Sequence, residues 1–307
     1  MNNKWYFVIN PVSGSGKGLA LWERVHRLLD AANIDYSFGI SEYHQHSIEL
    51  VTQKHQEGIR NFIGIGGDGT LNEMVNAIMN SKKEDGDSKS TISQLSVGTG
   101  NDWVKNFKEQ PTEFNLIERL NERKTLPHDI GIVESLSPKL KQYFINVAGA
   151  GLDGMVVHEL ERLSVSGKKS KLAYVQSMLK SLTQFNAPES QLIVGKSLVF
   201  SGRSLLVSAS KGQYFGGGMH ISPKALLSTG KLDITLVKKE SNLVVFPQLY
   251  KLFNGKIERA SFVEKFTDSK VEFTTSFPIP IQADGEFVGE SKHISFSVIK
   301  HAVLVLV

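Results

Sequence analysis

The chain has 307 residues, 40% of them apolar and 21% charged, which is enough for a sizeable core and favours two domains over one. It has no cysteine, which excludes disulfides, Cys-ligated zinc and thiol nucleophiles. The net charge of +4 is compatible with anionic lipid or nucleotide. No stretch combines clustered Lys and Arg with aromatic residues, so we expect no nucleic-acid partner.

The N-terminus and the apolar runs indicate where the chain acts. The first residues show no basic segment followed by a long apolar run, as a signal peptide would. No apolar stretch reaches the roughly 18–20 residues needed to span a bilayer. We therefore expect a cytoplasmic protein that contacts the membrane peripherally.

The first part of the chain alternates predicted strands and helices. Apolar runs predict strands at residues 5–9, 34–40, 62–65 and 92–97. Helical spacing predicts helices at 19–29, 47–57 and 71–78, with Ser47 as the cap of the second and a further helix from Trp103. This order predicts a doubly wound parallel sheet, which binds ligands at the carboxyl ends of its strands.

From about residue 128 the pattern changes to period two. It predicts strands at residues 143–147, 192–194, 198–208, 231–237, 271–275, 279–283 and 293–307, interrupted by one helix at 171–185. We therefore expect an antiparallel sandwich or barrel in the second half. The cleft between the halves is the default active site.

The first of three Gly-rich loops follows the first strand and runs from Asn10 to Gly18. Its small residues would let backbone N–H groups approach phosphate at a helix N-terminus. It is not a Walker A loop, because Pro11 and Gly18 stand where that motif needs Gly and Ser or Thr. A flexible turn is the alternative interpretation.

The second loop follows the third strand and contains GxGxxG, without the acidic residue that a dinucleotide site has at the end of the next strand. Gly66, Gly67 and Gly69 permit a tight turn with converging N–H groups. Asp68 would then direct its carboxylate toward a phosphate-bound metal. Alternatively, Asp68 is present because the turn needs its backbone conformation.

The third loop, residues 98–102, follows the fourth strand and supplies hydroxyl, amide and carboxylate groups at the same sheet edge. For Asp102, capping of the helix from Trp103 is the favoured interpretation. A basic cluster, Lys168, Lys169 and Lys171, would contact anionic headgroups or form a solvated helix start.

Together these loops resemble the catalytic domain of the diacylglycerol-kinase family, which includes bacterial lipid kinases, sphingosine kinases and ceramide kinases. The matching segments follow the family's order: Asn10-Pro11, Gly66-Gly67-Asp68-Gly69-Thr70 with Asn72-Glu73, Gly98-Thr99-Gly100-Asn101-Asp102, Gly167-Lys168 to Tyr174, Gly216-Gly217-Gly218-Met219 with Pro223, and Asp284-Gly285-Glu286. The segment Gly66-Gly67-Asp68-Gly69-Thr70 on its own is also found in NAD kinases, whereas the combination of all the segments is much more specific for the diacylglycerol-kinase family.

The resemblance implies an ATP-binding α/β domain at residues 1–127, completed by a final strand at 295–307, and a β-rich lipid-substrate domain at 128–294. It places these residues at the nucleotide: Asn10, Ser13, Gly66, Gly67, Asp68, Gly69, Thr70, Glu73, Thr99, Gly100 and Asn101. It also implies that the Asp284-Gly285-Glu286 turn carries the catalytic carboxylate.

One position departs from the family's pattern. Where the family often has Asp-Gly, with the Asp supporting a structural magnesium, this chain has Thr229-Gly230. A hydroxyl is a weaker ligand than a carboxylate for Mg²⁺, so this structural site is in doubt. Magnesium carried by ATP, with Asp68 as its protein ligand, is still expected.

Transfer of phosphate to a lipid hydroxyl requires a carboxylate that accepts the hydroxyl proton. Glu286 and Asp284 are the candidates, with Glu286 favoured as the base, Asp284 as its orienting partner and Asp68 assisting. A hairpin turn is the alternative interpretation of Asp284-Gly285.

The sequence thus predicts an ATP-dependent kinase of diacylglycerol or a related membrane lipid alcohol, of the kind used in phospholipid biosynthesis. Its expected cofactors are ATP and Mg²⁺, its expected partner is a membrane lipid, and a homodimer is compatible with the sequence. An NAD kinase and a catalytically silent nucleotide-binding regulator are the alternatives.

Overall fold

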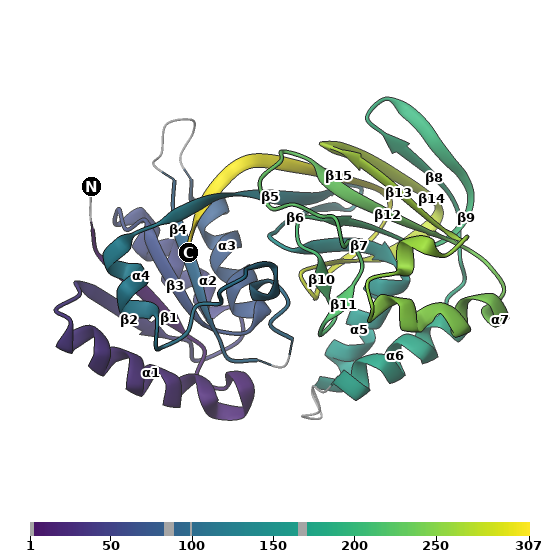
Figure 1. The fold of residues 1–307 in the computed structure, drawn as a ribbon. Helices are drawn as coiled ribbons and strands as arrows, with labels where there is room; N and C mark the ends of the chain where they lie inside the picture. Colours follow the sequence, from purple (N-terminus) through teal and green to yellow (C-terminus); the bar gives the residue numbers. More distant parts are fainter. Residues whose placement is uncertain (1–2, 83–88, 99, 165–170) are drawn as a thin grey trace. The chain divides into compact units, whose positions relative to one another are not determined.

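A computed structural model describes residues 3–82, 89–98, 100–164 and 171–307, and Figure 1 shows the fold. The chain forms two compact units: the first comprises residues 1–128 and 301–307, and the second residues 129–300. Strands β5 (Thr125–Leu136) and β15 (Glu286–Leu306) each contain residues of both units. The chain therefore passes from one unit to the other within these two strands.

The first unit is a parallel sheet with the strand order β2-β1-β3-β4, and the end of β15 lies beside β4. The strands are β1 (Trp5–Ile9), β2 (Tyr36–Ile40), β3 (Asn61–Gly66) and β4 (Thr91–Ser96). Leu304 and Val305 of β15 pair with Thr91 and Ile92. The predicted doubly wound α/β fold is confirmed.

The helices described in this unit are α1 (Ser13–Ala31), α2 (His46–Gln56), α3 (Asp68–Ser81) and α4 (Leu116–Glu122). Alternate residues of a strand point to opposite faces. Accordingly Phe7 packs against Trp22 of α1, and Tyr6 packs against Phe62 on the other face. Helices α1 and α4 cover one face of the sheet, and α2 and α3 cover the other (Figure 1).

Two details of the predicted helix starts are wrong. Helix α2 begins at His46 with Gln45 at its N-cap, so Ser47 lies inside the helix, where it is buried. The helical element that follows β4 most closely in the described residues is a short 3₁₀ helix, Val104–Asn106, with Trp103 at its N-cap position. Asp102 is therefore not a helix cap, and its carboxylate forms an ion pair with Lys105, N to O distance 2.6 Å.

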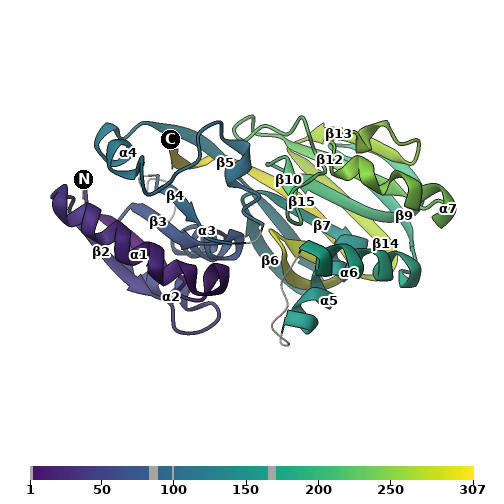
Figure 2. The same ribbon diagram turned by 60° about the horizontal axis from the view of Figure 1, so that its bottom comes forward.

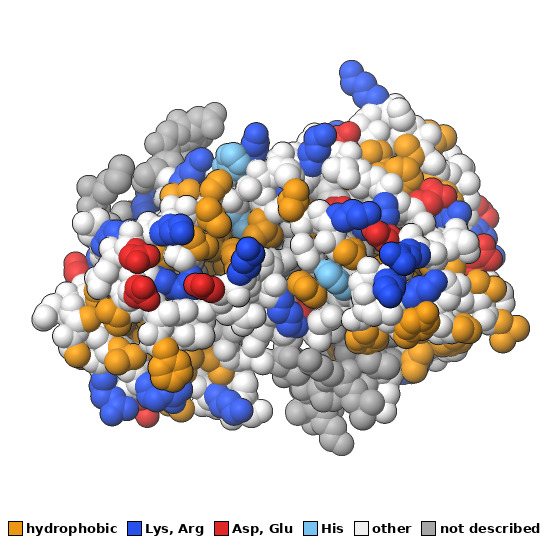
Figure 3. Space-filling model, viewed as in Figure 1, with side chains coloured by type: hydrophobic (Ala, Val, Ile, Leu, Met, Phe, Trp, Pro, Cys, Tyr) orange, Lys and Arg blue, Asp and Glu red, His pale blue; other side chains and the backbone are white. Residues whose placement is uncertain are grey.

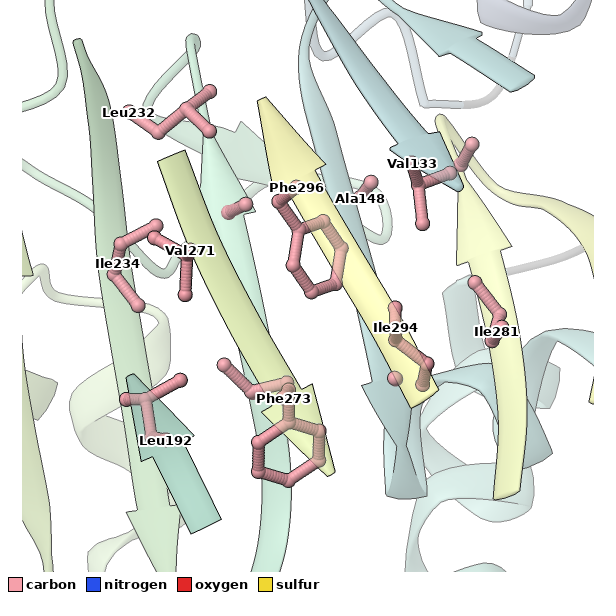
Figure 4. Close-up of a cluster of buried hydrophobic side chains, with 14 of the residues drawn as sticks. Val133, Ala148, Leu192, Leu232, Ile234, Val271, Phe273, Ile281, Ile294 and Phe296 are labelled. Atoms are coloured by element: carbon pink, nitrogen blue, oxygen red, sulfur yellow. The ribbon is translucent and has the colours of Figure 1, made fainter. Parts of the chain in front are cut away.

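The second unit is an antiparallel sheet with the order β13-β12-β9-β7-β14-β15, in which β8 pairs with β9 and β14, and β6 with β5. Its further strands are β6 (Lys139–Phe144), β7 (Val147–Gly151), β8 (Glu189–Val194), β9 (Ser197–Ser210), β10 (Tyr214–Phe215), β11 (Met219–His220), β12 (Leu232–Lys238), β13 (Val263–Asp268) and β14 (Lys270–Ala283). Figure 4 shows side chains of several strands meeting in its core, among them Phe273 and Phe296.

Helices cover a second apolar cluster of this unit. They are α5 (Leu152–Ser164), α6 (Lys171–Gln184) and α7 (Asn242–Val245), followed by the 3₁₀ helices η2 (Phe246–Leu252) and η3 (Ile257–Arg259). Figure 2 shows α5 and α6 side by side. The prediction of one helix in this half was therefore incomplete. Helix α5 follows β7 without a break, and the short strand Val-Ala-Gly-Ala-Gly carries little side-chain volume to indicate its boundary.

Candidate active site

The three Gly-rich loops meet at the carboxyl ends of β1, β3 and β4. The Asn10 N–H donates to the Ile65 carbonyl at 2.9 Å, and the Val97 N–H donates to the Gly66 carbonyl at 2.9 Å. The Ser13 hydroxyl donates to the Val97 carbonyl. These bonds join the start of α1, the end of β3 and the end of β4 into one edge of the sheet, as the sequence predicted.

Side chains are excluded where these loops approach one another. A Cβ atom on Gly98 would lie 3.1 Å from the Cα atom of Gly67, and a Cβ on Gly66 would lie 2.3 Å from Thr70 Oγ1. Glycine avoids a steric conflict at both positions. Gly67, Asp68 and Gly69 at the start of α3 are partly exposed, and the N-terminus of this helix favours negative charge.

Asp68 is the first residue of α3, and it connects two of the loops. Its Oδ2 atom accepts a hydrogen bond from the Asp102 N–H at 3.0 Å, and its Oδ1 atom accepts one from the Trp103 N–H at 3.3 Å. The Asn10 amide donates to Thr70 Oγ1 at 3.4 Å nearby. Asp68 therefore holds the third loop in place. As a carboxylate at this edge of the sheet it also has the chemistry of an Mg²⁺ ligand, since protein-bound Mg²⁺ usually takes one or two carboxylates beside substrate phosphates.

Of the other residues predicted to contact the nucleotide, Glu73 and Asn101 form hydrogen bonds within the first unit. Glu73 accepts a hydrogen bond from the Gln45 N–H at 3.3 Å, in the loop before α2. Asn101 donates from its amide to the Gly98 carbonyl at 3.1 Å, while its Oδ1 atom is buried and has no hydrogen-bond partner among the residues that the structure describes. Gly100 lies in the third loop, and Thr99 lies outside the described residues, so these nucleotide contacts stay predictions.

A cavity of about 280 Å³ lies beside the end of β4, at the lower end of the size of small-molecule sites. It is lined by Lys17, Leu21 and Arg24 of α1, residues 95–97 at the end of β4, and residues 111–114. Arg24 forms an ion pair with Glu113, Nε to Oε2 distance 2.7 Å. The sequence analysis missed these residues, although the spacing of Lys17 and Arg24, seven residues apart, places two cations on one helix face.

In the second unit, Asp284 and Gly285 form the two-residue turn between β14 and β15. Both have positive φ, 51° and 85°, which is typical of a type I′ hairpin, so the hairpin interpretation holds here. The Asp284 carboxylate accepts three backbone hydrogen bonds, from the Ile145 N–H at 2.8 Å and from the Asn146 and Val147 N–H groups at 2.9 Å. Glu286, half-buried, is the next residue.

Hydrogen bonds through Gln282 connect this turn to the buried side chain of Asp153. The Gly285 N–H donates to Gln282 Oε1 at 3.0 Å, and Gln282 Nε2 donates to Asp153 Oδ2 at 3.1 Å. Burial raises the pKa of Asp153 to about 6, although hydrogen bonds from Gln282 and from the Gly154 N–H act in the opposite direction. Nothing in the local sequence around Asp153 indicated this role, because Gln282, which connects it to the turn, is 129 residues away.

Two findings concern metals and membranes. Among residues 3–82, 89–98, 100–164 and 171–307, no group of three or more His, Asp or Glu side chains is arranged to hold a metal ion. No helix in the same part of the chain has the length and apolarity needed to cross a bilayer. Lys168 and Lys169 lie outside the described residues, as does the side chain of Lys171.

Comparisons with known proteins agree with this arrangement. Residues 4–133 match the family model "Diacylglycerol kinase catalytic domain", and residues 146–307 match "YegS C-terminal NAD kinase beta sandwich-like domain". The Bacillus subtilis protein named "Putative lipid kinase YtlR" is 26% identical over 93% of this chain and 94% of its own. The "Probable lipid kinase YegS-like" of Shewanella frigidimarina is 26% identical over 83% of this chain and 79% of its own.

Solved structures show the same fold. A Bacillus anthracis structure described as "a putative diacylglycerol kinase" has a TM-score of 0.77 at 18% identity, covering 99% of this chain and 96% of that one. An NAD kinase from Archaeoglobus fulgidus in complex with ATP has a TM-score of 0.54 at 12% identity, covering 99% and 93%. Because both domain models match in order along the chain, it belongs to the diacylglycerol kinase and YegS lipid kinase family.

Proposed function

We propose that this protein transfers the γ-phosphate of ATP to the hydroxyl of diacylglycerol or a related membrane lipid alcohol. The observation that carries the proposal is the edge formed by β1, β3 and β4. There Ser13, Gly67 and Gly98 come together, and Gly67, Asp68 and Gly69 at the start of α3 are partly exposed. Such an edge suits a polyphosphate, and relatives over most of the chain are named as lipid kinases.

In this proposal the first unit binds ATP. Backbone N–H groups of Gly66 and Gly67 and the N-terminal dipole of α3 hold the phosphates. Magnesium bound with ATP would neutralise charge on the transferred group, and Asp68 is the residue that would hold it. The cavity beside Lys17 would take the rest of the nucleotide, with apolar contacts from Leu21 and Phe114.

The second unit supplies the proton acceptor. The lipid hydroxyl oxygen forms a bond to the γ-phosphorus, the bond from that phosphorus to the bridging oxygen of ADP breaks, and the hydroxyl proton passes to a carboxylate. The Asp284 carboxylate already orients three backbone amides. We therefore assign Asp284 to hold the turn and Glu286 to accept the proton.

A membrane lipid can be reached only if the protein lies against a bilayer. The segment from α7 to η3 exposes apolar side chains, including Leu243 at 86% and Phe253 at 54%, and the cations Lys256 and Arg259 are exposed close by in sequence. Figure 3 shows apolar and basic side chains together at the lower right, where Figure 1 draws α7. We propose that this face contacts an anionic bilayer, since apolar insertion and basic charge together give surface binding.

The test is incubation of pure protein with γ-labelled ATP, Mg²⁺ and detergent-dispersed lipids, with label followed into the organic phase. We expect a labelled lipid, lost in Asp68→Asn and Glu286→Gln and retained in Glu290→Gln, which changes an exposed carboxylate of the same strand β15. In a parallel incubation with NAD in place of lipid, label found in NADP would establish the NAD-kinase alternative, whose fold is similar. ATP binding without transfer to either acceptor would favour a silent nucleotide-binding regulator.

A further inference from the structure

A fully buried lysine lies at the end of β9, outside the sites described above. Lys211 is 0% exposed, and its Nζ atom lies 2.8 Å from Asp129 Oδ2, also on a fully buried side chain. The ammonium also donates to the Lys231 carbonyl at 2.7 Å, and Asp129 Oδ2 accepts the Gly230 N–H at 2.6 Å. All of these residues belong to the second unit.

The ammonium connects three segments that are distant in sequence. Asp129 lies in β5, Lys211 directly follows β9, and Gly230 and Lys231 form the turn before β12. Burial of two charges is costly unless they are paired and hydrogen-bonded, and both conditions are met here. A cation at this point therefore holds the turn against β5 and the end of β9.

This is the turn at which the family resemblance places a structural magnesium. The residues present do not fit that ion. Thr229 is exposed, and its hydroxyl bonds to the backbone of Lys231, at 3.3 Å from the N–H and 3.4 Å from the carbonyl. The nearby carboxylate, Asp129, already faces an ammonium at 2.8 Å, which would repel a divalent cation.

We propose that the ammonium of Lys211 replaces the structural divalent cation. The second unit then carries its own cation, fixed by a covalent side chain, and folds to full stability without magnesium. The need of this protein for Mg²⁺ is limited to the nucleotide. This inference stands independently of the acceptor that the enzyme phosphorylates.

The experiment compares thermal unfolding midpoints of nucleotide-free protein in EDTA and in Mg²⁺, at matched ionic strength. We expect the wild-type midpoint to be the same in both. Lys211→Ala leaves the buried Asp129 carboxylate without its ammonium, and we expect its midpoint in EDTA to fall by roughly 6–20 °C. The double variant Lys211→Ala with Thr229→Asp restores a carboxylate at the turn, so its midpoint should fall in EDTA and recover in Mg²⁺.

A matched control is Lys265→Ala. Lys265 is also largely buried and forms an ion pair with Asp233, N to O distance 2.5 Å, on neighbouring strands of the same sheet. Its loss should lower the midpoint equally in EDTA and in Mg²⁺. Recovery by Mg²⁺ confined to the double variant would show that the ammonium occupies the position of the metal.

Three results would overturn the proposal. One is a saturable rise of the wild-type midpoint with Mg²⁺, and another is a Lys211→Ala midpoint equal to that of wild type. The third is a well-folded double variant that Mg²⁺ does not stabilise. Where the variants do not fold, Mn²⁺ titration of nucleotide-free wild type followed by electron paramagnetic resonance decides. Tight binding that Asp129→Asn abolishes would refute the proposal, and the absence of such binding would support it.

Discussion

Replacement of Asp284 by Asn tests how the hairpin turn of the second unit is held. The wild-type carboxylate accepts three backbone hydrogen bonds, from Ile145, Asn146 and Val147. Asparagine has one acceptor oxygen in place of two. With that oxygen in the position of Oδ1, it can still accept from Asn146 and Val147, but its NH₂ group then faces the Ile145 N–H, donor against donor.

The expected cost follows from these contacts. Hydrogen bonds to a charged acceptor each contribute about 1.5–3 kcal/mol, and bonds to a neutral acceptor about 1 kcal/mol. Loss of the bond from Ile145 and weakening of the other two therefore predict a destabilisation of about 3–5 kcal/mol. Local opening at Ile145 should become easier by about 1.5–3 kcal/mol, which is on the order of a 10- to 100-fold increase in amide exchange.

The assay is amide hydrogen exchange in a peptide that covers residues 145–147, with a phosphotransfer assay on the same samples. Tryptophan fluorescence does not report this region, because Trp5, Trp22 and Trp103 all lie in the first unit. Exchange is preferable to an unfolding midpoint here, because it reports local opening at residues 145–147 themselves.

Glu286→Gln is the matched control, because it alters the same turn and leaves the three hydrogen bonds of Asp284 in place. We expect it to abolish transfer without faster exchange at residues 145–147, whereas Asp284→Asn should accelerate exchange as well as lower activity. Unchanged exchange in Asp284→Asn would refute the structural role assigned to this carboxylate. Full activity in Glu286→Gln, with none in a folded Asp284→Asn, would identify Asp284 as the base.

Three further predictions concern other parts of the chain. Because the folded pKa of Asp153 is about 6, above its ordinary value of 3.8, the stability it contributes is complete below about pH 4 and lost as pH rises to about 6. That loss is about 3 kcal/mol at 1.36 kcal/mol per pKa unit. Urea unfolding at a series of pH values should show it as a fall in the free energy of unfolding of wild type and not of Asp153→Asn. The same pH dependence in both proteins would show that Asp153 is not its source. Gly66→Ala would place a Cβ atom 2.3 Å from Thr70 Oγ1, and since overpacking costs about 1–3 kcal/mol, calorimetry should show ATP binding weakened roughly 10- to 100-fold. Gly64→Ala, whose Cβ would lie 3.7 Å from its nearest neighbour, should bind ATP as wild type does. Equal affinities of the two variants would argue against the close contact at Gly66. Phe253→Ser should reduce co-sedimentation with phosphatidylglycerol vesicles, whereas Leu198→Ser, which changes a similarly exposed residue on β9, should leave it unchanged. An equal loss in both variants would show that the segment from α7 to η3 is not a specific membrane-binding face.

The edge at which the Gly-rich loops meet was predictable because each of these loops is encoded locally. A strand, a Gly-rich turn and a helix start follow one another within about ten residues at Asn10 and again at Gly66. In a parallel sheet, such turns come to the same edge whatever the order of the strands. The prediction therefore required only that these strands be parallel, which they are.

Contacts between distant segments could not be predicted in this way. The isolated sequence around Asp153, Lys211 or Asp284 shows ordinary polar residues, and their partners lie 129, 82 and up to 139 residues away. Helix α5 was missed for a related reason, since it is stabilised by packing on β7 and β14 more than by a capping signal of its own.

The departure at Thr229 was visible only against the family resemblance, whereas the sequence by itself determined the two halves, their parallel and antiparallel character and the Gly-rich loops. These depend on periodicity and on turn chemistry, which act over a few residues. Only the tertiary structure decided which charge faces which, including the ammonium of Lys211 on Asp129 beneath the turn that follows Thr229. The physical reason is that the energy of a buried charge depends on groups that the fold, and not the local sequence, brings within hydrogen-bonding distance.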